Sequence, residues 1–256
     1  MIWTFRLHRI SLLLLSEGDV MDTAQKQEIL SKFKIWFKDG LIESHKANTL
    51  KLTSLDEFNI NPFLLYYLSN YLEGNSDARS LAKVLIYPRV LGTSVTTSFG
   101  TQMQTFLTKV LDAYGSTTSG IDIEFVDANG YRKYCQLKSG PNALNRDDVK
   151  TIKSHFDGVR SLARTNNLRV DVNDMIFCLL YGEPHEKNSF IKELEKDYPV
   201  LIGKQFWQAF TGDENFYQDL IDAVAEIAQE VDMKSLVDGV IDDLAEEIKA
   251  KFSLVI

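Results

Sequence analysis

Apolar side chains recur at helical spacing through much of the first hundred residues. In residues 22–38 one stripe contains Ile29, Leu30, Phe33, Trp36 and Phe37, and residues three and four apart share one face of a helix. Three more helices are predicted in this part of the chain. Pro62 opens the first of them and Pro88 follows the second, and they cover residues 62–72, 77–86 and 98–114.

The pattern changes to alternation after Gly120. Residues 121–126 alternate apolar and acidic side chains, and residues 131–138 alternate again. Asn129 and Gly130 stand between them, a pair that favours the tight turn of a β-hairpin. We therefore predict two antiparallel strands joined by a short turn.

A long amphipathic helix is expected after the hairpin. Asn145 can cap it, and Asp147 and Asp148 in its first turn suit the helix dipole. Its apolar stripe consists of Val149, Ile152, Phe156, Val159 and Ala163.

The remaining elements complete an α/β fold. Residues 175–181 are continuously apolar, as expected of a central strand covered on both faces, and residues 200–202 predict a shorter strand. Two amphipathic helices are predicted at 214–230 and 234–250. The expected fold is a mixed sheet flanked by helices, with a helical N-terminal part.

The domain organisation follows from these elements. Residues 1–20 place Arg6 and Arg9 before a short apolar stretch with no small-residue cleavage site. This composition favours a leader or a spurious N-terminal extension over a targeting signal. Residues 21–256 are predicted to form a single domain, divided into a helical region at 21–92, a central core at 93–212 and C-terminal helices at 213–256.

Charge is distributed unevenly along the chain. The formal net charge is −8, yet residues 130–170 hold nine Lys/Arg against three acids. Residues 213–256 hold twelve acids against three lysines. A basic middle and an acidic tail are typical of a protein that offers one face to phosphate.

Composition and cysteine usage predict a cytoplasmic protein. The apolar fraction is 45% and the charged fraction 25%, and no segment approaches the roughly 18 apolar residues of a membrane helix. No membrane association is therefore expected. Cys135 and Cys178 each lie in an apolar run, which predicts buried, reduced thiols and no disulfide.

Four polar side chains converge on the predicted hairpin. Asp122 and Glu124 share a face of the first strand, and Gln136 and Lys138 share a face of the second, because alternate residues of a strand point the same way. Carboxylate and amide oxygens are hard ligands suited to Mg²⁺. A neighbouring lysine can orient a water and stabilise negative charge. Such a set suits phosphodiester hydrolysis.

A solvent-exposed sheet face with alternating charges would show the same spacing. Three features favour the chemical interpretation. Ile121, Ile123 and Phe125 mark a buried opposite face, Lys138 ends its strand at a Ser-Gly-Pro turn, and the most basic helix of the chain follows at once.

The segments Gly120-Ile-Asp-Ile-Glu-Phe125 and Tyr134-Cys-Gln-Leu-Lys-Ser-Gly-Pro-Asn142 resemble the PD-(D/E)xK nuclease core. More narrowly, they are similar to type II restriction endonucleases. The segments 203–207 and 211–213 are similar to the branch of those enzymes that cuts GGNCC-like sites. The looser similarity runs from Thr93 to Tyr217.

The resemblance implies a restriction-endonuclease-like core, at 93–212, and Mg²⁺-dependent hydrolysis of double-stranded DNA. Its expected catalytic residues are Asp122, Gln136 and Lys138. Asp122 and Gln136 would bind Mg²⁺ with Glu124 as an auxiliary ligand, and Lys138 would position the attacking water. The expected DNA contacts, after the catalytic strand and on the basic helix, are Asn142, Arg146, Lys150, Lys153, Arg160 and Arg164.

The expected assembly is a homodimer, in which each subunit cuts one strand of a near-palindromic site. A cognate DNA methyltransferase is the expected functional partner. Base readout depends on groove geometry, so the motif does not specify the recognition sequence.

The chain departs from the family pattern in the motif and in the preceding helix. Gln136 stands where Glu or Asp is usual, and Ile121 where a proline often precedes the aspartate. Gln102 and Gln104 occupy the stretch from which many relatives supply an acid. Two alternatives stay open: a repair or junction-resolving nuclease on the same core, and a DNA-binding protein whose nuclease core has decayed.

The other polar and aromatic candidates are predicted to be structural. The four histidines have no metal-ligand spacing. His155 is expected to be solvated on its helix, with a phosphate contact as the alternative, and Asn145 to be a helix cap and not a DNA contact. The aromatic segment 63–71 and the group Phe206, Trp207 and Phe210 are predicted to belong to the core.

Overall fold

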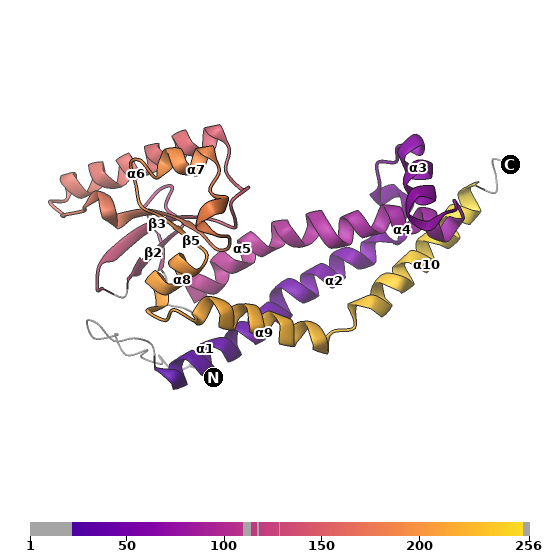
Figure 1. The fold of residues 1–256 in the computed structure, drawn as a ribbon, viewed down its shortest axis with the longest axis horizontal. Helices are drawn as coiled ribbons and strands as arrows, with labels where there is room; N and C mark the ends of the chain where they lie inside the picture. Colours follow the sequence, from indigo (N-terminus) through magenta and orange to yellow (C-terminus); the bar gives the residue numbers. More distant parts are fainter. Residues whose placement is uncertain (1–21, 110–113, 117, 128, 253–256) are drawn as a thin grey trace, which may run out of the picture. The chain divides into compact units, whose positions relative to one another are not determined.

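The computed structural model describes residues 22–109, 114–116, 118–127 and 129–252 (Figure 1). The expected leader at 1–20 lies outside these residues. The described residues divide into two compact units, one made of 22–26 with 114–217 and the other of 27–109 with 218–252. The first unit contains the sheet, and the second is built from helices.

The sheet has five strands in the order β1-β2-β3-β4-β5. β1, β2 and β3 pair antiparallel, whereas β3, β4 and β5 pair parallel. A mixed sheet flanked by helices confirms the predicted α/β fold class. The strands are Tyr114–Gly115, Ile123–Val126, Arg132–Lys138, Met175–Leu179 and Val200–Ile202.

Helices cover both faces of the sheet (Figure 1). α6 (Arg146–Thr165) and α7 (Ser189–Leu194) lie over one face, and α8 (Lys204–Thr211) lies over the other. Phe156 of α6 packs in one core cluster with Phe177 of β4. On the other face, the ring of Phe125 lies 4.7 Å from that of Phe210. Cover on both faces explains why β4 is continuously apolar.

The predicted hairpin is present, and Asp127 closes its turn. The Asp127 carboxylate accepts the backbone N–H groups of Asn129 and Tyr131 at 3.0 and 2.9 Å. Gly130 has a φ of 83°, a conformation that glycine adopts at little cost. The sequence signal of Asn129-Gly130 therefore corresponds to a real turn.

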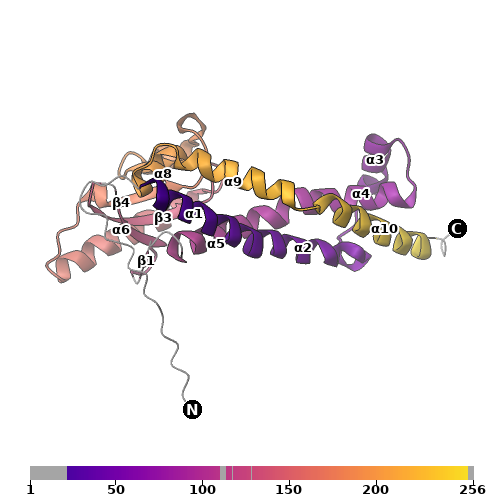
Figure 2. The ribbon, with the colours of Figure 1, turned by 90° about the horizontal axis from the view of Figure 1, so that it is seen from below.

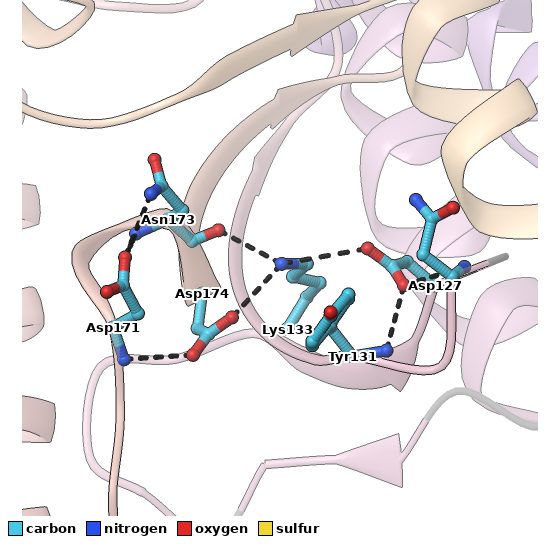
Figure 3. A network of polar contacts seen from close by, with 7 residues as sticks. Asp127, Tyr131, Lys133, Asp171, Asn173 and Asp174 are labelled. Carbon is cyan, nitrogen blue, oxygen red and sulfur yellow. Dashed lines mark hydrogen bonds and ion pairs between the residues drawn. The ribbon is translucent and has the colours of Figure 1, made fainter.

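Lys133 ties this hairpin to the start of β4 (Figure 3). Its ammonium lies 3.6 Å from the Asp127 carboxylate and 3.0 Å from that of Asp174, and it donates to the Asn173 carbonyl at 3.1 Å. The Lys133 side chain is only 13% exposed. Lys133 is one of the nine basic residues in the segment 130–170, and its charge is thus neutralised by acids within the fold.

The start of α6 agrees with the prediction. The Asn145 side chain accepts the backbone N–H groups of Asp147 and Asp148, and the Asp148 carboxylate accepts the N–H of Asn145 in return. This reciprocal capping satisfies backbone donors that a helix start leaves unpaired. The predicted apolar stripe of α6 is buried throughout.

The second unit is a set of long helices that run alongside one another (Figure 2). Ala82 and Ile86 of α4 share a buried core with Ile241 and Leu244 of α10. In the described part of the chain, no helix is both long enough and apolar enough to span a membrane. The longer helices, some shared with the first unit, are α1 (Thr23–Trp36), α2 (Glu43–Leu50), α3 (Pro62–Glu73), α4 (Ala78–Pro88), α5 (Ser94–Lys109), α9 (Phe216–Glu230) and α10 (Met233–Phe252).

Several predicted helix ends are wrong because helical turns continue past the expected breaks. A π-helical segment, Phe37–Ile42, joins α1 to α2, which the sequence pattern did not predict because the α2 sequence is largely polar. A second, Arg89–Thr93, follows Pro88 and leads into α5. Pro88 therefore interrupts regular α-helical geometry without ending the helical path.

Two boundaries next to the sheet also differ from the prediction. Tyr114, expected at the end of a helix, pairs with Glu124 in the short strand β1. The strand expected at 175–181 ends at Leu179. Strand pairing between distant segments decides both ends, and local periodicity does not report it.

The prediction that residues 63–71 belong to the core is wrong. On α3 only Leu65 and Ser69 are buried, and Phe63 is 86% exposed. The other large exposed apolar side chains of this helix are Leu64, Tyr66, Tyr67, Leu68, Tyr71 and Leu72. By contrast, Phe206 and Trp207 of α8 are buried as predicted.

Candidate active site

Asp122 immediately precedes β2 and is bonded to β3 twice. Its backbone N–H donates to the Cys135 carbonyl at 3.1 Å. Its carboxylate Oδ2 accepts the backbone N–H of Leu137 at 2.7 Å. These two bonds attach Asp122 to the residues on either side of Gln136, so the predicted neighbours do lie together.

Gln136 and Lys138 point to the face of the sheet that α6 covers. In the parallel register they stand opposite Phe177 and Leu179 of β4, which belong to the core beneath α6. Gln136 is 9% exposed, and the Lys138 side chain is 38% exposed. Solvent exposure therefore increases along the strand, from the buried amide of Gln136 to the accessible ammonium of Lys138.

Gln136 contacts α6 through His155. The amide Nε2 lies 3.1 Å from the imidazole Nδ1. The prediction that His155 is a solvated helix residue is therefore wrong. Its side chain is partly buried against β3, because it stands beside the apolar stripe of α6 and not on the outer face of the helix.

Lys138 contacts α6 through Asp148. The ammonium Nζ lies 3.3 Å from Asp148 Oδ1, while Asp148 Oδ2 takes part in the helix cap. One carboxylate thus joins the N-terminus of α6 to the expected catalytic lysine. Asp148 is 25% exposed, so solvent weakens this ion pair only in part.

Glu124 is buried and engaged on the same side of the hairpin. Ser116 donates to its Oε1 at 2.6 Å, and Arg132 donates to its Oε2 at 3.2 Å. Both carboxylate oxygens therefore have partners in the protein. Each oxygen keeps a second lone pair, so these bonds orient the Glu124 carboxylate and leave it able to accept a further contact.

The turn after β3 forms a tightly packed rim. A Cβ at Gly140 would lie 2.3 Å from the Tyr181 ring, so only glycine allows the two segments to approach so closely. Asn188 donates to the Pro141 carbonyl at 2.9 Å. Asn142, the predicted DNA contact, is exposed on this rim.

The basic residues of α6 lie on the side away from β3. At about 100° per residue, Arg146, Lys150 and Arg164 share one outer direction, whereas Asp148 and His155 lie roughly half a turn round. The Lys153 ammonium is 2.7 Å from Asp197 and 3.8 Å from Glu193. Arg160 lies 3.9 Å from Asp157.

Burial raises the pKa of two groups on β3. Burial raises the pKa of the Cys135 thiol well above its usual value, with Cys178 adding to the effect. Burial also raises the pKa of the Tyr134 hydroxyl, and nearby Glu124 contributes. Cys135 and Cys178 are both free and buried, as predicted.

The donor set fits Mg²⁺. Asp122 offers a carboxylate and Gln136 an amide oxygen, and Mg²⁺ commonly takes one or two carboxylates, keeping its other positions for water and phosphate. In the residues that the structure describes, no three His, Cys, Asp or Glu side chains are grouped to hold a metal ion.

Comparison with known families identifies the chain. The profile of the family described as Type II restriction endonuclease EcoO109I matches residues 49–232, which is more than half of the 256 residues. The chain belongs to this family. No curated protein matches it.

The EcoO109I family assignment confirms the resemblance found in the sequence. The matched region contains both strands of the hairpin, the whole of α6 and all the predicted site residues. It also includes α3 and α4, so the family extends well beyond the short motif.

Two residues around the site were missed in the sequence. Asp148 was interpreted only as a first-turn acid that suits the helix dipole, and His155 as a solvated residue. They stand seven residues apart, which places them on the same side of α6. That spacing, next to a buried stripe and directly after the strand of Gln136 and Lys138, was the available signal.

Proposed function

We propose that this member of the EcoO109I family is a Mg²⁺-dependent, type II site-specific deoxyribonuclease. The observation that carries the proposal is the attachment of Asp122 to β3 on both sides of Gln136. It groups a carboxylate, an amide oxygen and an ammonium on neighbouring strands. Within a restriction endonuclease family, this set suits hydrolysis of a phosphodiester bond.

In this proposal Asp122 and Gln136 hold the metal. When bound, Mg²⁺ supplies Lewis-acid polarisation of the phosphoryl group. Asp122 contributes the negative charge, and its bond to Leu137 keeps the carboxylate at β3. Gln136 contributes a neutral amide oxygen. Because its side chain is buried, the surrounding residues restrict where this oxygen can lie.

Lys138 would orient the attacking water and stabilise the extra negative charge of the transition state. Its ammonium is accessible enough to meet DNA, and Asp148 holds it at 3.3 Å. Holding a long, flexible side chain in one place reduces the entropy lost when the substrate arrives. Asp148 is therefore a positioning residue for Lys138.

For DNA binding we propose two regions. Asn142 on the rim is next to the catalytic strand and suits a contact near the cut. Arg146, Lys150, Lys153, Arg160 and Arg164 face away from that strand, so we assign them to phosphates farther along the duplex. Lys153 contributes least, because two acids already neutralise its charge.

We further propose a homodimer, since one centre per chain cuts one strand and a duplex has two. Of the large apolar side chains that are exposed in the described residues, seven lie on α3, which makes this helix the proposed contact with a second copy. The functional partner would be a DNA methyltransferase that protects the host site. We also propose a cytoplasmic location, because there the enzyme would meet incoming DNA.

Two other functions use the same core. A repair or junction-resolving nuclease would recognise DNA structure and not a short sequence. A DNA-binding protein with a decayed core would bind without cutting. The retained contacts of Asp122 and Lys138 support the active enzyme over the decayed core.

One experiment separates the three. Linear duplexes with and without a GGNCC-like site are incubated with the protein in Mg²⁺, in Mn²⁺ and in excess chelator, with Asp122→Ala as the control. The proposal expects discrete, metal-dependent fragments from site-containing DNA. Cutting of branched DNA alone indicates the repair enzyme, and binding without cutting in either metal indicates the decayed core.

A further inference from the structure

A histidine outside the nuclease motif contacts Gln136, the residue that stands where the motif usually has Glu or Asp. His155 Nδ1 lies 3.1 Å from Gln136 Nε2. An amide nitrogen donates and does not accept. In this arrangement Nδ1 is therefore the acceptor, the ring proton is on Nε2, and the bond directs the amide oxygen Oε1 away from His155.

The replacement of Glu by Gln makes side-chain orientation matter. A carboxylate presents oxygen whichever way its end group is turned. An amide presents oxygen in one orientation and N–H in the other, and N–H groups repel a cation. A glutamine that serves as a metal ligand thus needs a neighbour that distinguishes its two ends.

We propose that His155 is a positioning residue that holds Gln136 with its amide oxygen toward the bound Mg²⁺. The inference rests on the proposed function, because it assumes a metal at Asp122 and Gln136. It assigns a role to a residue that neither the motif nor the family match singles out.

The surroundings of His155 suit this role. A Cβ at Gly120 would lie 2.2 Å from the imidazole Cγ, so the ring fills the space that this glycine leaves beside β2. Neighbouring Ile152, Phe156 and Val159 of α6 are all buried. The imidazole is therefore confined between the Gly120 backbone and Gln136.

A hydrogen bond between His155 and Gln136 could also serve only to stabilise the fold. The test therefore compares the loss of His155 in two sequence backgrounds. His155→Ala is made in the natural chain and in Gln136→Glu, where both terminal atoms are oxygen. Mn²⁺ binding to the DNA-free protein is followed by the electron paramagnetic resonance of free Mn²⁺. His155→Asn, which offers an acceptor oxygen near the position of Nδ1, is the conservative variant. Exposed His185 provides the matched control, His185→Ala.

The inference expects His155→Ala to weaken Mn²⁺ binding about 2- to 10-fold in the natural chain, the effect of one net hydrogen bond. His155→Asn should recover most of the loss, and His185→Ala should change nothing. In the Gln136→Glu background, His155→Ala should leave Mn²⁺ binding unchanged or tighter. Nitrogen chemical shifts of the metal-free protein should show His155 protonated on Nε2.

The contrary outcomes are distinct. Equal weakening in both backgrounds, or an Nδ1–H tautomer, makes the contact structural and overturns the positioning role. If His155→Ala binds Mn²⁺ as tightly as the natural chain does, the positioning role is overturned as well. Asp122→Asn tests the proposed function separately. If that change leaves Mn²⁺ binding intact, the metal site itself is wrong and this inference fails with it.

Discussion

The carboxylate of Asp122 accepts the backbone N–H of Leu137 at 2.7 Å. Leu137 is the residue that separates Gln136 from Lys138, so this bond places a charge from the β2 side between two polar side chains of β3. A carboxylate held by a backbone donor does not depend on side-chain rotamers of β3. The site is thus partly preorganised by main-chain geometry.

Lys138→Ala should lower the cleavage rate by about 10² to 10³-fold, the typical cost of losing one preorganised transition-state donor. DNA affinity should change little, because the ammonium acts mainly on the transition state. Single-turnover cleavage and a separate binding titration measure the two effects. The exposed Lys192 provides the control, Lys192→Ala. Cleavage at the natural rate in Lys138→Ala would remove this lysine from the mechanism.

Asp148→Asn should slow cleavage about 5-fold, since a partly exposed ion pair contributes about 1 kcal/mol. The asparagine keeps an oxygen for the helix cap, so stability should fall less than activity. Asp147→Asn, at an exposed position of the same first turn, is the matched variant. A rate loss shared equally by both variants would assign the effect to the helix terminus.

Gln136→Ala should raise the Mg²⁺ concentration needed for cleavage, because a ligand oxygen is lost. Gln136→Glu should retain activity and lower that concentration, because the oxygen stays and a negative charge is added. The measurement is a Mg²⁺ titration of supercoiled-plasmid cleavage. A titration curve that Gln136→Ala leaves unchanged would contradict the ligand role.

The two central lysines of α6 should differ in their contribution to DNA binding. Lys150 is exposed and has no ion-pair partner among the described residues, so Lys150→Ala should flatten the slope of log K against log salt by about 0.9. Lys153→Ala should have a smaller effect, because Asp197 already pairs with its ammonium at 2.7 Å. Binding is measured in the Lys138→Ala background. If neither Lys150→Ala nor Lys153→Ala changes the salt slope, this face of α6 does not contact DNA.

Lys133→Met should destabilise the fold by about 2 kcal/mol, since it leaves Asp127 and Asp174 facing each other without the cation between them. Urea denaturation measures the change, with Lys192→Met as the exposed control. A loss below about 0.5 kcal/mol would show that the network in Figure 3 contributes no more than a surface substitution.

The double variant Tyr67→Lys with Tyr71→Lys should dissociate the proposed dimer. The two rings stack with centroids 6.0 Å apart on the exposed face of α3. Light scattering gives the mass, and plasmid assays should show nicking where the natural protein linearises. Leu91→Lys, at a site 77% exposed, is the control. A monomeric natural protein would refute the proposed dimer. If the double variant stays dimeric, the dimer contact does not lie on α3.

Local pattern determined much of this protein's architecture. Alternation over Ile121–Val126, the Asn129-Gly130 turn and the capping group at Asn145 specify their elements through contacts between near neighbours in sequence. The apolar stripe of α6 likewise depends only on helical periodicity. For this reason the hairpin, the helix and the spacing of Asp122, Gln136 and Lys138 could be predicted without tertiary structure.

Contacts between distant segments decided the rest. The pairing of Tyr114 with Glu124, the exposure of the α3 aromatics and the neutralisation of Lys133 all depend on what packs against a residue. So do the contacts of His155 with Gln136 and of Asp148 with Lys138. The sequence places His155 and Asp148 on one side of α6, beside its buried stripe, but only the packing of α6 on β3 decides which side chains they meet.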